Sequence, residues 1–446
     1  MTVPAKSATR ARRTLVVRAD DVRSFSELAP ERDEVLCVTL VGSEAETGEA
    51  WGFEAGALGR SHGLIERLGE VIDESGVELV VVPDWEDASS PDERAAIRAA
   101  VAAASVRDVE VALQRDAEPI PAQAAQARLS AAARARSSAD ERTATAVISA
   151  WNKRDDVRAN LLGLRAQTRP FDDVVVVDNR STDGTPEMIR EEFPEVRLVV
   201  MPNSAYGACE TFNVGFASAL TDFVAILDDD VVLTPWWLER TLDRFAEEPD
   251  STAVVSTKVV EPGMPDSYRD SEAVNRERYM STFRGCASLA RKKALDEAGG
   301  YDERLFIYGN ERDLTCRLLN LGYRVLQFPG AETFHRTPFG VQMGKRSLYY
   351  HARNAWLGML KYAPAKDLAK MPYLVLTKVL LRGSGAEEKG EVSDAVGTIG
   401  IGKAVRQTKG SWWILTKAGC SVLYNVPYCL KHRKPVKAED FELPLR

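Results

Sequence analysis

The chain has 446 residues, enough for two or three domains and at least one large buried core. Its composition is that of an ordinary globular protein, and its six cysteines form no CxxC pair, which argues against a zinc site or a disulfide framework and favours a reducing cytoplasm. The net charge is −8, but residues 340–446 carry 18 Lys and Arg against 8 Asp and Glu, a local +10 that leaves −18 for the rest.

No targeting or membrane-spanning segment is expected. The basic residues 1–13 are followed by an apolar run that is too short and too soon charged for a signal peptide. The apolar residues 371–381 fall well short of the roughly 20 needed to cross a bilayer.

The first 115 residues predict a small α/β domain. Short apolar runs alternate with helical patterns, and the segments are 14–17, 35–42, 61–76, 77–84, 91–106 and 109–113. The acidic residues near position 85 lead into a helix start, so we expect a structural or partner-binding role for this domain. Residues 116–144 are rich in Ala, Arg and Ser and predict a partly helical linker.

From residue 145 a regular alternation of strands and helices begins. Strands are predicted at 145–150, 172–178, 196–201 and 223–230, with helices at 155–168, 185–193 and 207–220. This succession predicts a largely parallel sheet with helices on both faces, and ligands bind such sheets at the carboxyl ends of the strands.

Three carboxylates stand at one of those ends. Asp228, Asp229 and Asp230 follow an apolar run that is typical of a buried strand. Burying a carboxylate costs several kcal/mol unless it is compensated, so the triplet indicates a cation, a positive ligand or water at the sheet edge. Hard oxygen ligands favour Mg²⁺ or Mn²⁺ carrying phosphates.

Two further segments point to the same edge. Asp178 ends the second strand, where a carboxylate can bind a nucleotide or simply form a turn, and Asp183 is suited to cap the next helix. Gly207 opens a helix whose free amides could face a diphosphate. Asn213, six residues on, either reaches back toward the nucleotide or packs.

With these motifs in order, the chain resembles the inverting glycosyltransferases of family 2, and within them the bacterial rhamnosyltransferase-like members. The resemblance runs from about residue 145 to His335. It rests on residues 146–168, on 174–185, on the N-x₃-G-x₅-N-x-G pattern, on 225–238 in the place of the family's Asp-x-Asp, and on 285–325 as the acceptor-side segment.

The resemblance implies an α/β fold of the GT-A type: a Rossmann-like mixed sheet at 145–340, preceded by the small N-terminal domain and followed by a mainly helical region at 341–446. It also implies site residues. The nucleotide sugar would be bound by Ala150, Asn152, Asp178, Gly207, Asn213, Asp228 and Asp229, and the metal by Asp228, Asp230 and His335. Of the three aspartates, we expect Asp228 and Asp230 to be the functional pair and Asp229 to point elsewhere.

The acceptor-side helix departs from the commonest family pattern. Alignment on Asp313 and Arg317 puts Asn310 and Glu311 at the positions of the usual Glu-Asp pair, so Glu311 would be the catalytic base. If Asn310 is the N-cap, Asp313 can bond back to it in a capping box, which favours Glu311 as the base and leaves Asp313 structural.

For several residues near these motifs the sequence leaves the role undecided. Arg336 and Lys345 could contact the diphosphate, and Trp236 and Trp237 suit either stacking on a sugar or core packing. The basic residues 341–446 are also rich in Tyr and Trp, which suits either contact with an anionic membrane or a solvated helical face.

The sequence therefore predicts a metal-dependent, cytoplasmic glycosyltransferase, peripheral on the inner face of the membrane. Its partners would be a nucleotide-diphosphate sugar and a glycan or lipid-linked acceptor, without nucleic acid, and a homo-oligomer stays open. The alternatives are a sugar-phosphate nucleotidyltransferase, for which no Gly-rich, Lys-containing loop follows Ala150, and a non-catalytic carbohydrate-binding relative.

Overall fold

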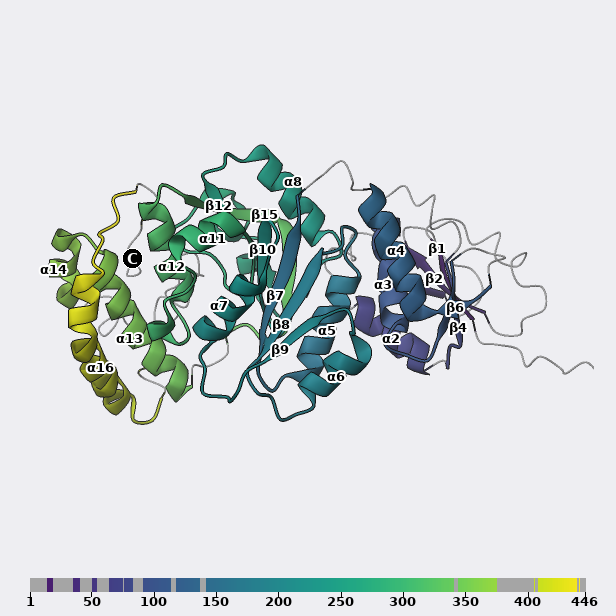
Figure 1. Cartoon of the computed structure of the whole chain (residues 1–446), viewed down its shortest axis with the longest axis horizontal. Helices are drawn as coiled ribbons and strands as arrows, with labels where there is room; N and C mark the ends of the chain where they lie inside the picture. The colour runs from purple at the N-terminus through teal and green to yellow at the C-terminus, as the bar shows by residue number, and fades with distance from the viewer. Residues whose placement is uncertain are drawn as a thin grey trace, which may run out of the picture. The chain divides into compact units, whose positions relative to one another are not determined.

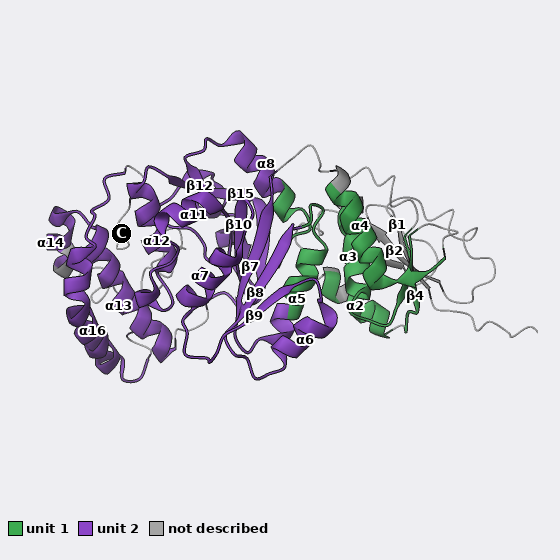
Figure 2. Ribbon diagram, in the orientation of Figure 1, with its two compact units in different colours: residues 1–141, 158–170, 232–239 green, residues 142–157, 171–231, 240–446 purple. Residues whose placement is uncertain are grey.

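The structure is a computed structural model. The residues that it describes are 14–18, 35–40, 50–53, 64–74, 76–82, 91–113, 118–136, 142–340, 344–374, 405, 408–438 and 441. The chain divides into two compact units, one formed by residues 1–141, 158–170 and 232–239 and the other by residues 142–157, 171–231 and 240–446 (Figure 2). None of the helices within the described ranges is both long enough and apolar enough to cross a bilayer; residues 375–381, the end of the apolar C-terminal run, lie outside those ranges.

The first unit contains a six-stranded sheet. Its strand order is β3-β2-β1-β4-β5-β6, and all neighbouring pairs are parallel except β5 with β6. The strands are β1 (Thr14–Arg18), β2 (Val35–Leu40), β3 (Ala50–Phe53), β4 (Leu79–Val81), β5 (Glu110–Ala112) and β6 (Ile120–Pro121). The helices are α2 (Leu64–Glu74), α3 (Pro91–Ala104) and α4 (Ala122–Arg136).

The segment expected to be a linker is folded into this unit. Residues 120–136 form β6, which pairs with β5, and α4, which packs on α3. Ala122, Ala125 and Leu129 of α4 are buried, and the Gln126 amide donates to the carbonyl of Arg165 at 2.8 Å. Alanines lower the average hydrophobicity of a segment, yet in a helix they allow close packing, which is why composition alone indicated a linker here.

The second unit contains a nine-stranded mixed sheet (Figure 1). Its order is β11-β15-β12-β14-β10-β7-β8-β9, with β13 paired to β15. The strands are β7 (Ala144–Ala150), β8 (Asp173–Asp178), β9 (Arg197–Val200), β10 (Phe223–Asp228), β11 (Val231–Leu233), β12 (Thr252–Val260), β13 (Arg278–Tyr279), β14 (Ala287–Arg291) and β15 (Arg324–His335). Strands β10, β7, β8 and β9 are parallel, as the alternating pattern predicts, and β14 runs antiparallel to both β10 and β12.

Helices complete this unit. They are α6 (Thr185–Glu192), α7 (Ala208–Ser218), α9 (Asp266–Arg269), α10 (Glu272–Asn275), α11 (Lys292–Ala298), α12 (Asn310–Asn320), α13 (Lys345–Tyr362), α14 (Ala365–Leu374) and α16 (Ser411–Lys431). Two further helices are divided between the units: residues 158–165 of α5 (Arg154–Arg165) and residues 237–239 of α8 (Trp237–Glu247) fall in the ranges of the first unit. Helix α7 packs on β7 and β8 so closely that a Cβ on Gly215 would clash with Val147. Within the described residues 344–374 and 408–438 the C-terminal region is mainly helical, as predicted, and it is part of the same unit as most of the sheet.

Sheet register brings the polar strand ends together. Ala150 of β7 is opposite Asp178 of β8, and Ser149 is opposite Asp228 of β10. The parallel strands β12 and β15 end side by side, with Val260 opposite Phe334. Because each of these strands ends at the same edge, chain segments more than a hundred residues apart contribute to one site.

Candidate active site

The acidic triplet stands at the carboxyl end of β10. Residues 223–227 of this strand are almost completely buried, and the chain turns at Asp229 and Asp230 before β11 begins. Asp230 is buried, whereas Asp228 and Asp229 are partly exposed. The apolar strand therefore fixes the backbone, and the turn directs the carboxylates to the sheet edge.

Asp230 is held by three side chains. Its Oδ2 accepts hydrogen bonds from Lys153 Nζ at 2.6 Å and from Thr337 Oγ1 at 2.7 Å, and its Oδ1 lies 3.1 Å from His335 Nε2. Burial by itself would raise the pKa of Asp230, but the bonds from His335 and Lys153 outweigh it, and the pKa lies well below its ordinary value. Asp230 is therefore a fixed negative charge.

His335, the last residue of β15, joins two carboxylates. Its Nδ1 lies 2.8 Å from Oε1 of Glu261, the residue that follows β12. Burial lowers the pKa of His335, but the bonds to Asp230 and Glu261 outweigh it and raise the pKa to about 10. Glu261 is thus the partner that orients the imidazole, as expected of the group behind a metal-binding histidine.

The arrangement fits a divalent cation. One ligand atom from each of Asp228, Asp230 and His335 lies within 4.8 Å of the other two. Burial, followed by the charge of Asp230, raises the pKa of Asp228 to about 7, although the neighbouring His335 opposes this rise. Two carboxylates and an imidazole suit Mn²⁺ or Mg²⁺.

Asp229 faces another direction. Its Oδ2 accepts a hydrogen bond from the backbone amide of Trp151 at 3.2 Å, and its Oδ1 lies 3.7 Å from Lys153 Nζ. Burial raises the pKa of Asp229 to about 6 although Lys153 opposes this. Asp229 therefore stabilises the loop after β7, and its oxygens are not among the three clustered ligand atoms.

The ends of β7 and β8 form the expected nucleotide side. Asp178 is buried; its Oδ2 accepts from the Ser181 amide at 2.9 Å, and its Oδ1 has no partner within the described part of the chain. Burial raises the pKa of Asp178. A buried carboxylate oxygen without a partner is costly, so this oxygen is available to a donor group of a ligand. Ala150 lies beside it, and its carbonyl accepts from the Asn179 amide at 2.8 Å.

Asn152 connects these two strand ends. It adopts a left-handed conformation with φ of 52°, its amide donates to Ser181 Oγ at 2.8 Å, and its Oδ1 accepts from the Thr182 amide at 2.8 Å. Asn152 thus bonds to the same loop as Asp178, and its side-chain oxygen already stabilises that loop. Asp183 accepts hydrogen bonds from the amides of Arg154 and Thr185, the first residues of α5 and α6, whereas the N-cap of α6 is Gly184.

The expectation that Gly207 offers free helix amides needs correction. The Gly207 amide donates to Glu210 Oε2 at 2.6 Å, and the Cys209 amide donates to the carbonyl of Phe306 at 3.1 Å. A Cβ on Gly207 would clash with the backbone of Phe306, so this glycine allows close approach of the loop before α12.

Asn213 packs, the second of the two interpretations open for it. Its Nδ2 donates to the carbonyl of Tyr301 at 2.9 Å and its Oδ1 accepts from the Tyr301 amide at 2.7 Å. Both polar ends of the amide are therefore used within the protein, and nothing in the geometry supports contact with a nucleotide.

Glu311 lies in the first turn of α12. Its Oε1 accepts a hydrogen bond from Asn310 Nδ2 at 2.8 Å, and any Cβ on Gly285 would clash with it. Burial raises the pKa of Glu311 to about 7. The neighbour of Gly285, Cys286, accepts at its carbonyl from the Asp228 amide at 3.1 Å. Residues 285 and 286 thus bring Glu311 close to the acidic cluster.

The capping scheme predicted for this helix is wrong. The N-cap is Gly309, which has φ of 74° and accepts from the Asp313 amide, and Asn310 is the first helical residue. Asp313 is buried and pairs with Lys361 Nζ and with Arg317 Nε, the latter at 3.0 Å. Its structural role therefore comes from an ion-pair cluster and not from a capping box.

The other residues that the sequence placed near the site have different environments. Arg336 pairs with Asp156 at 2.7 Å, and Lys345 is an exposed residue at the start of α13. Trp236 and Trp237 are both buried, so core packing is their role and stacking on a sugar is excluded.

Sequence reasoning missed several residues of the site. Lys153, Glu261 and Thr337 contact the metal-binding candidates, and Trp151 is an exposed ring beneath the guanidinium of Arg346, 5.7 Å from it. Only Lys153 carried a usable signal, since it follows directly on a predicted strand end at the same edge as Asp230.

Comparison with known proteins identifies the domain that carries this site. Residues 145–301 match the family model for glycosyl transferase family 2. An N-acetylglucosaminyl-diphospho-decaprenol L-rhamnosyltransferase of Mycobacterium tuberculosis is 27% identical over 209 residues, 38% of this chain and 68% of that protein. A pre-mycofactocin glycosyltransferase of the same species is 27% identical over 228 residues, 47% of this chain and 46% of that protein, so the match spans about half of that relative.

A mannosyltransferase from Pyrobaculum calidifontis, solved in complex with GDP-Man and Mn²⁺, has a TM-score of 0.40 and 18% identity, covering 68% of this chain and 85% of that one. The family match covers residues 145–301 and supports a glycosyltransferase domain in this part of the chain. More particularly, residues 145–301 match glycosyl transferase family 2, and the sheet is mixed, as the sequence led us to expect.

Proposed function

We propose that this protein transfers a sugar from a nucleotide-diphosphate sugar to an acceptor hydroxyl with inversion at the anomeric carbon. The observation that carries the proposal is the meeting of two groups at one sheet edge. One is the cluster of Asp228, Asp230 and His335, which suits a diphosphate-bound cation. The other is Glu311, a partly buried residue whose carboxyl pKa is raised to about 7 by desolvation.

The donor would be held from both sides of β7. Asp178, with its unpartnered Oδ1, is placed to accept from a hydroxyl or imino group of the nucleoside. Asp228, Asp230 and His335 would hold Mg²⁺ or Mn²⁺, which when bound neutralises the developing charge on the leaving diphosphate. For this, His335 has to release its proton and Lys153 has to give up its bond to Asp230 Oδ2. The freed ammonium would remain beside the phosphates.

Glu311 would act as general base. Its carboxylate accepts the proton of the acceptor hydroxyl while that oxygen attacks the anomeric carbon, and the bond from this carbon to the diphosphate oxygen breaks as the new bond forms. The nucleoside diphosphate leaves with the bonding electron pair. A pKa near 7 suits this role because the group is substantially ionised at neutral pH and still basic enough to accept a proton.

The name of one relative suggests the chemical class of the acceptor. The rhamnosyltransferase acts, by its name, on an N-acetylglucosaminyl-diphospho-decaprenol. We extend this to a lipid-linked glycan acceptor at the cytoplasmic face of the membrane, with a hexose or deoxyhexose as the transferred sugar and a role in polysaccharide biosynthesis. The basic, aromatic C-terminal region supports this extension.

A screen of labelled nucleotide sugars tests the proposal. The full chain is incubated with each donor and Mn²⁺, and both slow donor hydrolysis and transfer to lipid-linked acceptors are measured. We expect at least one donor to be turned over, and Asp230→Asn to weaken the response to Mn²⁺ by about tenfold or more. Asp250→Asn, at a fully exposed carboxyl, is the matched control. An Asp230→Asn protein with an unchanged Mn²⁺ response would exclude the metal role.

A further inference from the structure

Helix α16 has two chemically different faces. Its inner face packs on α13, and the two helices lie side by side (Figure 1). The buried residues of this face are Ser411, Ala418, Val422, Asn425 and Cys429. Val422 and Cys429 join the same apolar core as residues of α7 and α12, so α16 is an integral part of its unit.

The outer face of α16 is exposed and apolar. Five large side chains on it have 58 to 82% of their surface exposed, and they are Trp412, Trp413, Leu423, Tyr424 and Leu430. They are more than half of the large hydrophobic side chains that the described part of the chain exposes strongly. Residues seven or eleven positions apart share a side of a helix, and these spacings relate Trp412 to Leu423, Trp413 to Tyr424 and Leu423 to Leu430, so the five lie on one side of α16. An exposed apolar face of this kind marks an interaction site.

The charge of this segment selects the partner. Residues 408–438 contain six Lys and Arg and no Asp or Glu. Lys417 Nζ lies 5.4 Å from the ring centre of Trp413, so a basic group and an aromatic ring share the outer face. Tryptophan and tyrosine favour the boundary between headgroups and acyl chains, while lysines extend to the phosphates. The combination complements an anionic lipid surface better than an apolar protein surface.

We propose that the outer face of α16 docks this protein on the surface of an anionic phospholipid bilayer. The helix lies in the plane of the interface, with Trp412, Trp413, Leu423, Tyr424 and Leu430 inserted among the lipids. The basic residues around it contact lipid phosphates.

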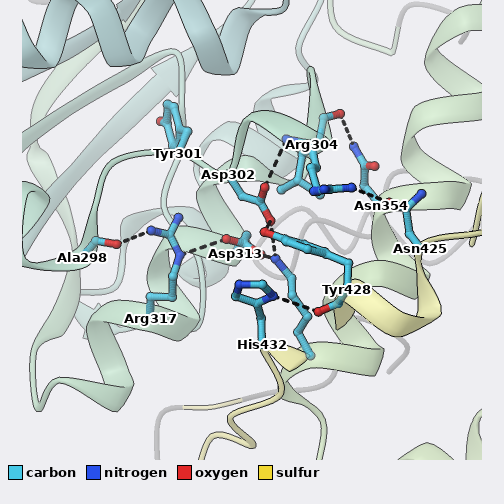
Figure 3. Close-up of polar contacts among 12 residues, drawn as sticks. Ala298, Tyr301, Asp302, Arg304, Asp313, Arg317, Asn354, Asn425, Tyr428 and His432 are labelled. Carbon is cyan, nitrogen blue, oxygen red and sulfur yellow. Dashed lines mark hydrogen bonds and ion pairs between the residues drawn. The ribbon is translucent and has the colours of Figure 1, made fainter. Parts of the chain in front are cut away.

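The inner face of α16 connects this surface to the base-bearing helix. Tyr428 OH donates to Asp302 Oδ2 at 3.0 Å (Figure 3). Lys361 Nζ donates to the same oxygen at 2.8 Å and also to Asp313. The guanidinium of Arg304 lies 4.2 Å from the ring centre of Tyr428. Asp313 is two residues from Glu311 on α12. The docked helix thus holds the acceptor side of the site near the lipid surface, a consequence that rests on the proposed function, whereas the docking itself does not.

Vesicle flotation of the full chain tests the docking. Vesicles of phosphatidylcholine alone are compared with vesicles of phosphatidylcholine and phosphatidylglycerol, at low and high salt. We expect binding to the anionic vesicles that weakens as salt rises. A variant with Trp412→Ser, Trp413→Ser, Leu423→Ser and Tyr424→Ser should partition about tenfold or more weakly. Its melting temperature should match that of the unaltered chain, because the changed side chains are exposed.

Leu220→Ser with Leu321→Ser is the matched control, since both leucines are exposed and lie outside α16. This variant should float like the unaltered chain. The proposal is overturned if the unaltered chain fails to float with anionic vesicles or if the α16 variant floats equally well. It is also overturned if light scattering shows that the unaltered chain is a dimer and the α16 variant a monomer while neither protein binds vesicles. A second copy of the chain would then cover the outer face of α16.

Donor hydrolysis in Mn²⁺, measured on the same preparations without lipid, separates this proposal from the proposed function. If both hold, the α16 variant hydrolyses donor as the unaltered chain does. Flotation without any hydrolysis in either protein would reject the proposed function and leave the docking intact.

Discussion

Two carboxyl groups of α12 differ sharply although they are two residues apart. Asp313 is buried between the cations Lys361 and Arg317. Glu311 instead receives a hydrogen bond from the neutral amide of Asn310 and lies against Gly285. Burial without a cation raises the pKa of Glu311 to about 7. The two environments assign a structural role to Asp313 and support a proton-accepting role for Glu311.

The raised pKa predicts the pH dependence of transfer. Because the base must be ionised, the transfer rate should rise with pH through about 7 and level off above it. A rate profile measured from pH 5 to 9 with saturating donor would reveal this limb. A flat profile over this range would show that no group with such a pKa is required.

The same shift predicts a stability effect. Between the ordinary pKa of 4.5 and the folded value of about 7, the folded chain keeps a proton that the unfolded chain releases, so the free energy of unfolding falls as pH rises through this interval. Glu311→Gln removes this loss, and we expect a gain of at most about 3 kcal/mol at pH 8 and almost none near pH 4. Urea unfolding at both pH values checks it. The exposed Glu272→Gln should show no such difference.

Lys361 offers a further test at the scale of single residues. Its buried ammonium contacts both Asp302 and Asp313, so Lys361→Met would leave two buried carboxylates without this cation. We expect a loss of about 3–5 kcal/mol in the free energy of unfolding. Lys292→Met, which breaks a surface pair with Asp296, should cost less than about 1 kcal/mol. Equal losses in the two variants would contradict the buried-cluster account.

At the scale of elements, the loop between residues 305 and 309 is held in an unusual shape. Phe306 and Tyr308 have φ of 67° and 66°, values that side chains other than glycine rarely adopt and that cost about 1–3 kcal/mol each. Asn354 of α13 compensates, because its Nδ2 donates to the carbonyls of Leu305, Ile307 and Tyr308 at 2.8 to 3.0 Å. This clamp fixes the start of α12 and hence the position of Glu311.

Asn354→Ala should therefore reduce catalysis more than substrate binding. We expect kcat to fall by about tenfold or more while KM for the donor stays nearly unchanged, because the base moves and the donor contacts do not. Asn275→Ala, which removes a similar amide bonded to two carbonyls away from the site, is the control. A loss of stability in Asn354→Ala without any fall in kcat would mean that the clamp is merely structural.

The sequence predicted helices and strands well where a single local pattern of residues determines them. The apolar strands and the polar residues at their ends, among them Asp178 and Asp228, are local patterns. Other features depend on partners far away in the chain. Asn213 bonds to Tyr301, 88 residues on, and Lys153 bonds to Asp230, 77 residues on. Periodicity does not reveal such pairs. The start of α12 was misplaced because Asn is a common cap, whereas the left-handed Gly309 takes that place.

At the scale of the whole molecule, the boundary between the acidic and basic parts of the chain does not coincide with the boundary between the two compact units. Residues 340–446 carry a local charge of +10 and stand apart in composition, yet they belong to the same compact unit as the sheet. The contacts of Tyr428 and Asn425 with residues 302 and 304 explain why, since they attach α16 to the chain just before α12. The C-terminal segment thus differs from the rest of its unit in composition, yet buried polar contacts attach it to that unit.

The central claim is that Glu311 takes the acceptor proton in a glycosyl transfer, and Glu311→Gln tests it most directly. Donor binding by calorimetry and transfer in single turnover are measured on the same preparation with Mn²⁺. The account predicts that donor affinity stays within about threefold while transfer falls by at least about a hundredfold. A Glu311→Gln protein that binds donor normally and still transfers sugar at the rate of the unaltered chain would contradict it.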